Sequence, residues 1–100
     1  MAYICFCKDH PDSAELRRTH TKQHLTYIES ILQHVLVAGP LIREEFGEFN
    51  ASFFVYDTDV EAEALKLLHN DPYYKAGIYA EVRCQRFRPA AGTWIGGTTW

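Results

Sequence analysis

The chain has 100 residues, 47% of them apolar and 23% charged, so it can form one domain with a core but is too short for two. Its net charge of −3 and its scattered Lys and Arg exclude the basic surface of a nucleic-acid-binding protein. Neither an apolar run of about 20 residues nor a signal-peptide pattern occurs, so we expect a cytoplasmic protein with no membrane contact.

Residues 2–8 form the first predicted strand, with apolar side chains on both faces. After Pro11, Asp12 or Ser13 can cap a helix that we expect to run to about residue 34. Apolar side chains recur there every three or four residues, and two histidines share the stripe: Leu16, His20, His24, Tyr27, Ile28, Ile31 and Val35. His24 therefore points inward, where a titratable ring serves either a structural hydrogen bond or chemistry.

A short second strand is predicted over 35–40, followed by a connecting loop over 41–50. Residues 52–57 form a third strand that is again apolar on both faces. Thr58 and Glu61 match a capping box and predict that a helix begins at this point.

That helix ends at Asp71-Pro72, because proline disfavours the helical conformation of the residue before it. Asp71 can then cap a short helical turn that ends at Gly77, and residues 79–87 form the last strand. The order β-α-β-β-α-β predicts an α+β, ferredoxin-like sandwich with both helices on one face of an antiparallel sheet. Strands with two apolar faces also predict that a second copy covers the open face, in a homodimer.

The three cysteines, Cys5, Cys7 and Cys84, are odd in number and lie in strand-like segments. We therefore expect reduced core thiols, as is usual in the cytoplasm. The spacing Cys5-x-Cys7 within a strand does not match the turn of a common zinc site, and no acidic third ligand accompanies His20 and His24. The sequence thus predicts no metal site.

Four segments together resemble the YciI-like proteins, in matching order and spacing over residues 1 to about 88. They are Arg17-x6-His24-Leu25, Ala38-Gly39-Pro40-Leu41, Ser52 entering a strand, and Asp71-Pro72-Tyr73 with Ala76-Gly77. The resemblance implies a ferredoxin-like domain in a dimeric α+β barrel, and an active-site His and Asp that map onto His24 and Asp71. Members often carry Arg three residues before the His, where this chain has Thr21. Residues 89–100 form a tail outside the pattern.

The resemblance further implies small-molecule chemistry, since one branch removes chloride from a chlorinated hydroxyquinol during aromatic breakdown. A carboxylate beside an imidazole fixes its tautomer and suits a general base. Arg17 or His20 can hold the resulting oxyanion, and Ser52 and Tyr73 can donate hydrogen bonds to the substrate. We therefore predict a cofactor-independent lyase of the dehydrochlorinase type, or an isomerase, acting on a small cyclic or aromatic oxygenated compound.

Two alternative functions and one question about the tail remain open at this stage. The same pair can serve a non-catalytic ligand-binding or accessory dimer, since helix capping alone explains Asp71. A haem- or flavin-using barrel enzyme is a third reading. In the tail, Trp94 is expected either to pack across a partner subunit or over the pocket, or to belong to a partly disordered terminus that includes Trp100.

Overall fold

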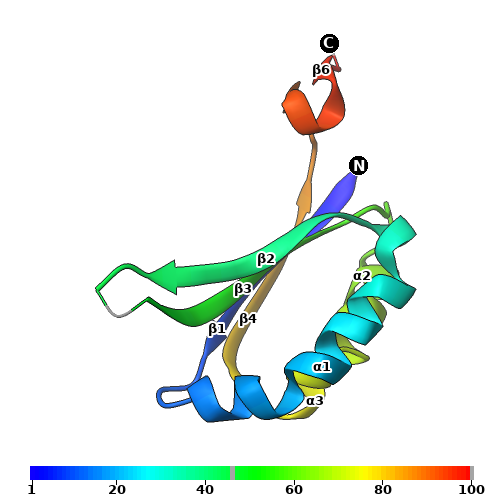
Figure 1. Cartoon of the computed structure of the whole chain (residues 1–100). Helices are drawn as coiled ribbons and strands as arrows, with labels where there is room; N and C mark the ends of the chain where they lie inside the picture. The colour runs from blue at the N-terminus through cyan, green and yellow to red at the C-terminus, as the bar shows by residue number, and fades with distance from the viewer. Residues whose placement is uncertain (46, 100) are drawn as a thin grey trace.

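The computed structural model describes residues 1–45 and 47–99 and contains one four-stranded antiparallel sheet. Its strands follow the order β2-β3-β1-β4 and are β1 (Ala2–Asp9), β2 (Val35–Arg43), β3 (Glu48–Tyr56) and β4 (Tyr79–Phe87). Three helices lie on one face of the sheet: α1 (Ala14–Ser30), α2 (Glu61–His69) and α3 (Pro72–Lys75) (Figure 1). This arrangement is the ferredoxin-like sandwich that the sequence predicts.

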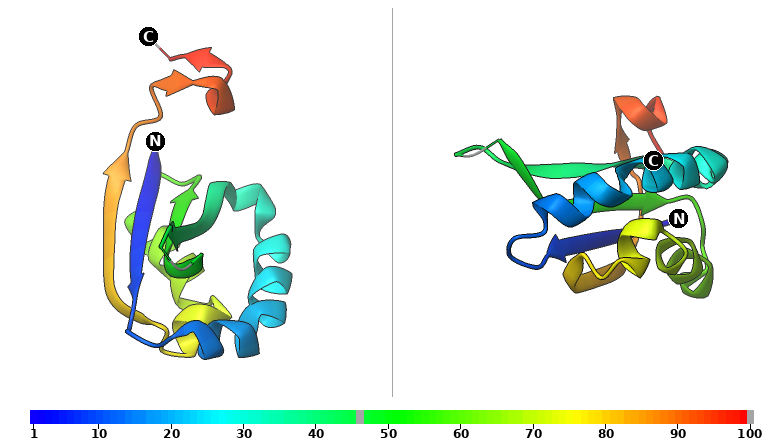
Figure 2. Two further views of the ribbon diagram at one scale, coloured as in Figure 1. Left: turned by 60° about the vertical axis from the view of Figure 1, so that its left-hand side comes forward. Right: turned by 60° about the horizontal axis from the view of Figure 1, so that its bottom comes forward.

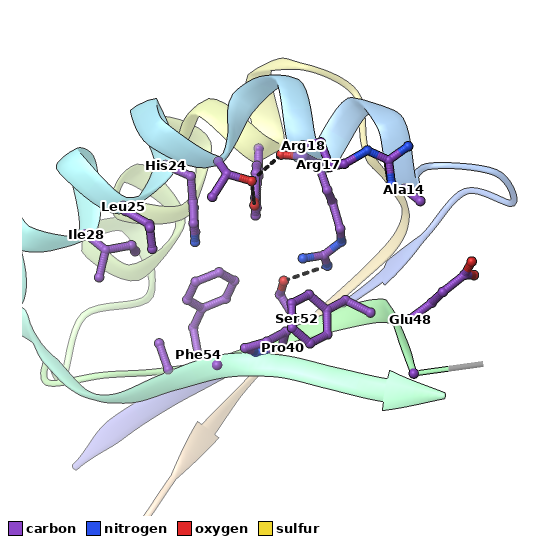
Figure 3. Close-up of a pocket in the computed structure, with 16 residues that line it drawn as sticks. Ala14, Arg17, Arg18, His24, Leu25, Ile28, Pro40, Glu48, Ser52 and Phe54 are labelled. Atoms are coloured by element: carbon purple, nitrogen blue, oxygen red, sulfur yellow. Dashed lines mark hydrogen bonds between the residues drawn. The ribbon is translucent and has the colours of Figure 1, made fainter. Parts of the chain in front are cut away.

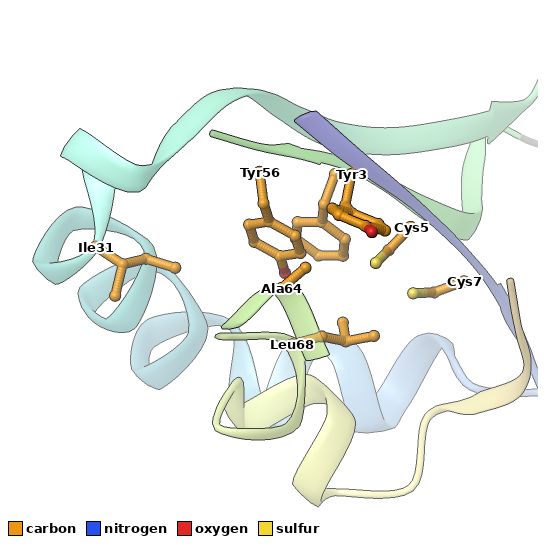
Figure 4. Packing of buried hydrophobic residues seen from close by; sticks show 8 residues of the cluster. Tyr3, Cys5, Cys7, Ile31, Tyr56, Ala64 and Leu68 are labelled. Carbon is orange, nitrogen blue, oxygen red and sulfur yellow. The ribbon is translucent and has the colours of Figure 1, made fainter. Parts of the chain in front are cut away.

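The core lies between the sheet and the helices. Because side chains alternate along a strand, β1 and β3 each present every second residue to the helices. Figure 4 shows the resulting cluster, which is completed by Ile31 directly after α1 and by side chains of α2. It consists of Tyr3, Cys5, Cys7, Ile31, Phe54, Tyr56, Ala64 and Leu68. No helix in residues 1–45 and 47–99 is long and apolar enough to cross a membrane.

Two predicted boundaries are wrong. The first helix ends at Ser30, because Ile31 (φ −112°) leaves the helical region and a 3₁₀ turn, η1 (Leu32–His34), leads into β2. Residues 41–43 and 48–50, which lie in the segment predicted as a loop, continue the ladder of β2 and β3 to the pair Arg43↔Glu48. The side chains there are exposed and many are polar, so the sequence does not indicate that the backbone groups of this hairpin are hydrogen-bonded.

The predicted capping box at Thr58 and Glu61 is also wrong. Val60 occupies the N-cap position of α2, and Thr58 Oγ1 accepts a hydrogen bond from its backbone N–H at 3.1 Å. The Thr58 hydroxyl donates to Glu63 Oε2 at 2.6 Å, so the threonine closes a turn before the helix. At α3 the predicted cap is confirmed, because Asp71 Oδ1 accepts from Tyr73 N–H at 2.9 Å.

The buried face of α1 is rotated from the predicted apolar stripe. Leu16 is 40% exposed, whereas Arg17 next to it is only 6% exposed. Arg17 turns inward because a carboxylate on β1, described below, lies within hydrogen-bond distance. Further along, Tyr27 and Ile28 pack against the core as the stripe predicts.

The expectation of three free thiols is wrong for two of the cysteines. Cys5 and Cys84 form a disulfide between β1 and β4, and Cys7 is free and buried. The antiparallel register sets Cys5 directly opposite Cys84, so both side chains point to the same face of the sheet. The two cysteines lie 79 residues apart, and the alternation of side chains along each strand does not determine how two such distant strands pair.

The C-terminal tail continues beyond β4 as a small hairpin, with β5 (Ala91–Gly92), a 3₁₀ turn η2 (Thr93–Ile95) and β6 (Gly97–Thr98). Figure 2 shows this hairpin projecting past the end of the sheet, away from the helices. Trp94 is 82% exposed, so within one chain it covers no pocket. Trp100 lies outside the described residues.

Cys7 provides a test of this thiol arrangement. Burial, helped by the negative charges of Asp71 and Asp9, raises the pKa of the Cys7 thiol to about 12. Since the thiolate is the nucleophile, the native protein should not react with iodoacetamide at pH 8. Mass spectrometry should show one labelled cysteine after unfolding without reductant and three after reduction. Three labelled cysteines without reductant would contradict the disulfide.

Candidate functional site

A pocket of about 530 Å³ lies between α1 and the strands β2 and β3. Figure 3 shows side chains reaching into it from the helix above and from the sheet below. Its walls are mostly apolar and include Leu25, Ile28, Pro40, Phe49 and Phe54. The buried and half-buried polar side chains lie together on the helix side and the sheet floor, and they are Arg17, Thr21, His24, Ser52 and Tyr73. Arg18 and Glu48 also line the pocket but are exposed.

His24 and Asp71 form a short hydrogen-bonded pair at this pocket. His24 Nδ1 lies 2.7 Å from Asp71 Oδ1, and the two side chains are 14% and 0% exposed. Because Nδ1 faces the carboxylate, a neutral His24 carries its proton there and leaves Nε2 as the free base. Figure 3 shows the His24 ring pointing from α1 toward the sheet side of the pocket.

The capping role of Asp71 and its bond to His24 are compatible. Oδ1 accepts both from Tyr73 N–H, at 2.9 Å, and from the imidazole. Within the described residues, Oδ2 has no hydrogen-bond partner although it is buried. A carboxylate without access to water is stabilised by these two donors, so His24 and the start of α3 depend on each other.

Arg17 is held beneath α1 by a second carboxylate. Its Nε and Nη2 donate to Asp9 Oδ2 and Oδ1 at 2.7 and 3.0 Å, and Nη2 also donates to Ser52 Oγ at 2.9 Å. Burial disfavours the cation, but the hydrogen bonds and the charge of Asp9 outweigh it and raise the pKa of Arg17 above its usual value. The bidentate partner neutralises this charge inside the protein.

Tyr73 lies between these two pairs. Its ring stacks on His24 with centroids 3.9 Å apart and planes inclined by 4°, and Arg17 Cζ lies 5.1 Å from the ring centroid. The hydroxyl is 3.1 Å from Thr21 Oγ1, which bonds to the Arg17 carbonyl at 2.5 Å. The ring is only 6% exposed.

The structure therefore brings together five of the six predicted site residues: His24, Asp71, Arg17, Ser52 and Tyr73. His20 is the exception, since it is half-buried and does not line the pocket. The structure does not place it with the other five, because the inward face of α1 runs through Arg17, Thr21 and His24.

Sequence reasoning missed Asp9 and Thr21. A signal for Asp9 was present, because it follows Tyr3, Cys5 and Cys7 in the inward phase of β1. The sequence places Phe49 in a predicted loop and Phe54 in a predicted strand, although both form part of the pocket wall. Among the described residues, no three His, Cys, Asp or Glu side chains are grouped as metal ligands.

Fold and site together define a class: a ferredoxin-like α+β domain whose apolar pocket ends in a His–carboxylate pair. A model of the YCII-related domain matches residues 1–88, and the chain belongs to this family. This match confirms the resemblance noted in the sequence.

Two relatives illustrate the family. An uncharacterized protein of Haemophilus influenzae is 30% identical over 95 residues, which cover 88% of this chain and 97% of the relative. A solved structure of 5-chloro-2-hydroxyhydroquinone dehydrochlorinase from Burkholderia phenoliruptrix AC1100, in complex with 2,5-dihydroxybenzoquinone, superposes with a TM-score of 0.82. It shares 27% identity, and the match covers 93% of this chain and 97% of that chain.

The Asp9–Arg17 pair should be costly to break from one side. Asp9→Ala leaves a buried guanidinium unpaired and should lower the free energy of unfolding by about 3–5 kcal/mol. Urea denaturation should be measured for Asp9→Leu, for Arg17→Met and for the double variant. The double variant should lose less free energy of unfolding than the sum of the two single variants. Asp59→Ala, at an exposed aspartate, is the control and should change little. Additive losses would contradict the coupling.

Proposed function

We propose that this protein is a cofactor-independent enzyme that removes HCl from a small hydroxylated aromatic compound, with His24 as the base and Asp71 as its orienting partner. The observation that carries the proposal is the 2.7 Å contact between His24 Nδ1 and the buried Asp71 carboxylate at the end of an apolar pocket. The superposition with a dehydrochlorinase that binds a dihydroxybenzoquinone supports the reaction class. Isomerisation of a related enol is the neighbouring reaction that the same base supports.

The reaction needs a base that can both take and return a proton. In a chlorinated hydroquinone, His24 Nε2 takes a hydroxyl proton and delivers it to the ring carbon that bears chlorine. The second hydroxyl then loses its proton while the C–Cl bond breaks, so the ring becomes a quinone and one HCl leaves. The departing chloride takes the electron pair, and no outside oxidant is required. The carboxylate of Asp71 stabilises the imidazolium between the two transfers.

The pocket favours an uncharged ring. Arg17 is neutralised by Asp9, and Asp71 adds a negative charge behind His24, so the pocket offers no buried uncompensated cation among its described lining residues. A carboxylate at the buried end of the pocket would lose its water without gaining a cationic partner there, since Arg18, which also lines the pocket, is exposed. Phe49, Phe54 and Pro40 supply flat apolar contacts for a planar ring, and the Ser52 hydroxyl at the floor can bond to a ring oxygen.

Replacing the base tests this proposal. His24→Gln keeps an amide donor for Asp71 but cannot carry a proton, so chloride release from 5-chloro-2-hydroxyhydroquinone should fall at least about a hundredfold. The Tm should change little, because Asp71 keeps a donor. His20→Gln, on the same helix but outside the pocket, is the control and should keep its rate. Unchanged chloride release in His24→Gln would overturn the assignment. Binding of 2,5-dihydroxybenzoquinone without turnover in the unmodified protein would favour the non-catalytic alternative.

We further propose that the active species is a homodimer joined through the open face of the sheet. Opposite the helices, β1 and β3 carry adjacent apolar pairs, Ile4↔Val55 and Phe6↔Phe53. In one chain no described helix covers this face (Figure 2), and packing against a second sheet would remove the apolar area from water.

Light scattering at micromolar concentration should therefore give twice the mass of the 11.5 kDa chain. Phe6→Lys, which places a charge at the centre of the face, should shift the protein toward monomers. Lys8→Gln, on the same face of β1, is the control and should leave the mass unchanged. A monomeric unmodified protein would contradict the dimer.

A further inference from the structure

Tyr73 makes three separate contacts with the His24–Asp71 pair and with the helix that carries His24. The sequence alone suggests a substrate hydrogen bond for this residue, but the structure commits its polar groups elsewhere. Each contact fixes a different part of the arrangement around His24. The first fixes the position of its carboxylate partner, the second the plane of the imidazole ring, and the third the distance between α1 and α3.

The backbone contact comes first. Tyr73 N–H and His24 Nδ1 both bond to Asp71 Oδ1, at 2.9 and 2.7 Å. Because Pro72 has no N–H, Tyr73 provides the donor that Asp71 caps. The bond from Tyr73 N–H fixes the position of Asp71 Oδ1, and His24 Nδ1 can donate to this oxygen only from one place.

The ring contact restrains the imidazole plane. His24 lies parallel to Tyr73 at 3.9 Å and meets Phe54 edge-on at 6.5 Å and 70°. Since His24 covers one face of the tyrosine, the Arg17 guanidinium, 5.1 Å from the centroid, lies against the other face. A turn of His24 about its Cβ–Cγ bond would push its edge into the tyrosine ring, so the stack opposes the motion that would break the bond to Asp71.

The hydroxyl ties the stack to α1. Thr21 Oγ1 donates its single proton to the Arg17 carbonyl at 2.5 Å, so the Tyr73 hydroxyl must be the donor in the 3.1 Å contact with Thr21. A chain of two hydrogen bonds thus runs from α3 through Thr21, one turn before His24, to the backbone carbonyl of Arg17 in α1. The proton of the tyrosine is engaged, and the buried ring presents no free donor to the pocket.

We infer that Tyr73 is a positioning residue, which holds His24 in one orientation and one tautomer through its stacked ring and does not bond to the substrate. The inference rests on the proposed function where it treats His24 as the base. The orientation of the ring is a separate property that can be measured without turnover.

The test compares two replacements of Tyr73. Tyr73→Leu removes the stack, and Tyr73→Phe keeps the stack but removes the bond to Thr21. In ¹⁵N NMR spectra of the imidazole, His24 should show a single Nδ1–H tautomer in the unmodified protein and in Tyr73→Phe, and a mixture in Tyr73→Leu. With a chloride-releasing substrate, kcat of Tyr73→Leu should fall about tenfold to a hundredfold, with KM within about twofold. Thr21→Val is the matched control for the hydroxyl and should resemble Tyr73→Phe.

Two results would overturn the inference. The first is a Tyr73→Leu variant with a lower Tm but an unchanged tautomer and kcat, which would make the ring a packing element only. The second is an equal loss in Tyr73→Phe and Tyr73→Leu with a raised KM, which would return the hydroxyl to the substrate. If Tyr73→Leu does not fold, Tyr73→Met fills similar space with a flexible chain and carries the same expectations. A protein that releases no chloride but shows the expected tautomers would count against the proposed function alone.

Discussion

The carboxylate of Asp71 is fully buried, and the arrangement of the helices follows from the need to satisfy it. A charge removed from water must be met by donors. Of the two that bond to Oδ1, His24 lies 47 residues before Asp71 in the chain and Tyr73 lies two residues after it. One donor belongs to the middle of α1 and the other to the first turn of α3. Apolar contacts between these helices tolerate small shifts, whereas a short hydrogen bond to a buried anion does not. This bond therefore restricts the relative position of α1 and α3 more tightly than the apolar contacts do.

A second buried charge follows the same rule further along α1. Arg17 needs Asp9 and Ser52, which lie on β1 and β3, so this pair anchors the helix to the sheet. The two anchors are seven residues apart on α1, on one face of the helix. Between them the helix spans the pocket without apolar side chains beneath it, which explains how a cavity survives in so small a domain.

The extent to which the sequence predicts this structure depends on the range of the interaction. Strand alternation and helix caps at residues 2–8 and 71–77 act over a few positions, and they predict the elements and their order. The predicted buried face of α1 was wrong because the apolar periodicity favours burial of Leu16 over Arg17. The carboxylate of Asp9 reverses this preference by pairing with the buried Arg17 side chain. The disulfide of Cys5 with Cys84 depends on the register of two distant strands. The pairing of His24 with Asp71 was reached through the family resemblance alone, since no local pattern joins residues so far apart.

The hairpin of β2 and β3 extends beyond the layer of helices (Figure 1) and provides one wall of the pocket. The His24–Asp71 pair, in contrast, is supplied by α1 and by the N-cap of α3. The sheet-side wall of the pocket and the His24–Asp71 pair therefore come from separate parts of the chain. Insertions or substitutions near the tip of the hairpin can reshape the space offered to a ligand while the imidazole and its carboxylate stay in place. If the proposed function holds, a fold divided in this way can acquire new substrates while the base and its carboxylate keep their geometry.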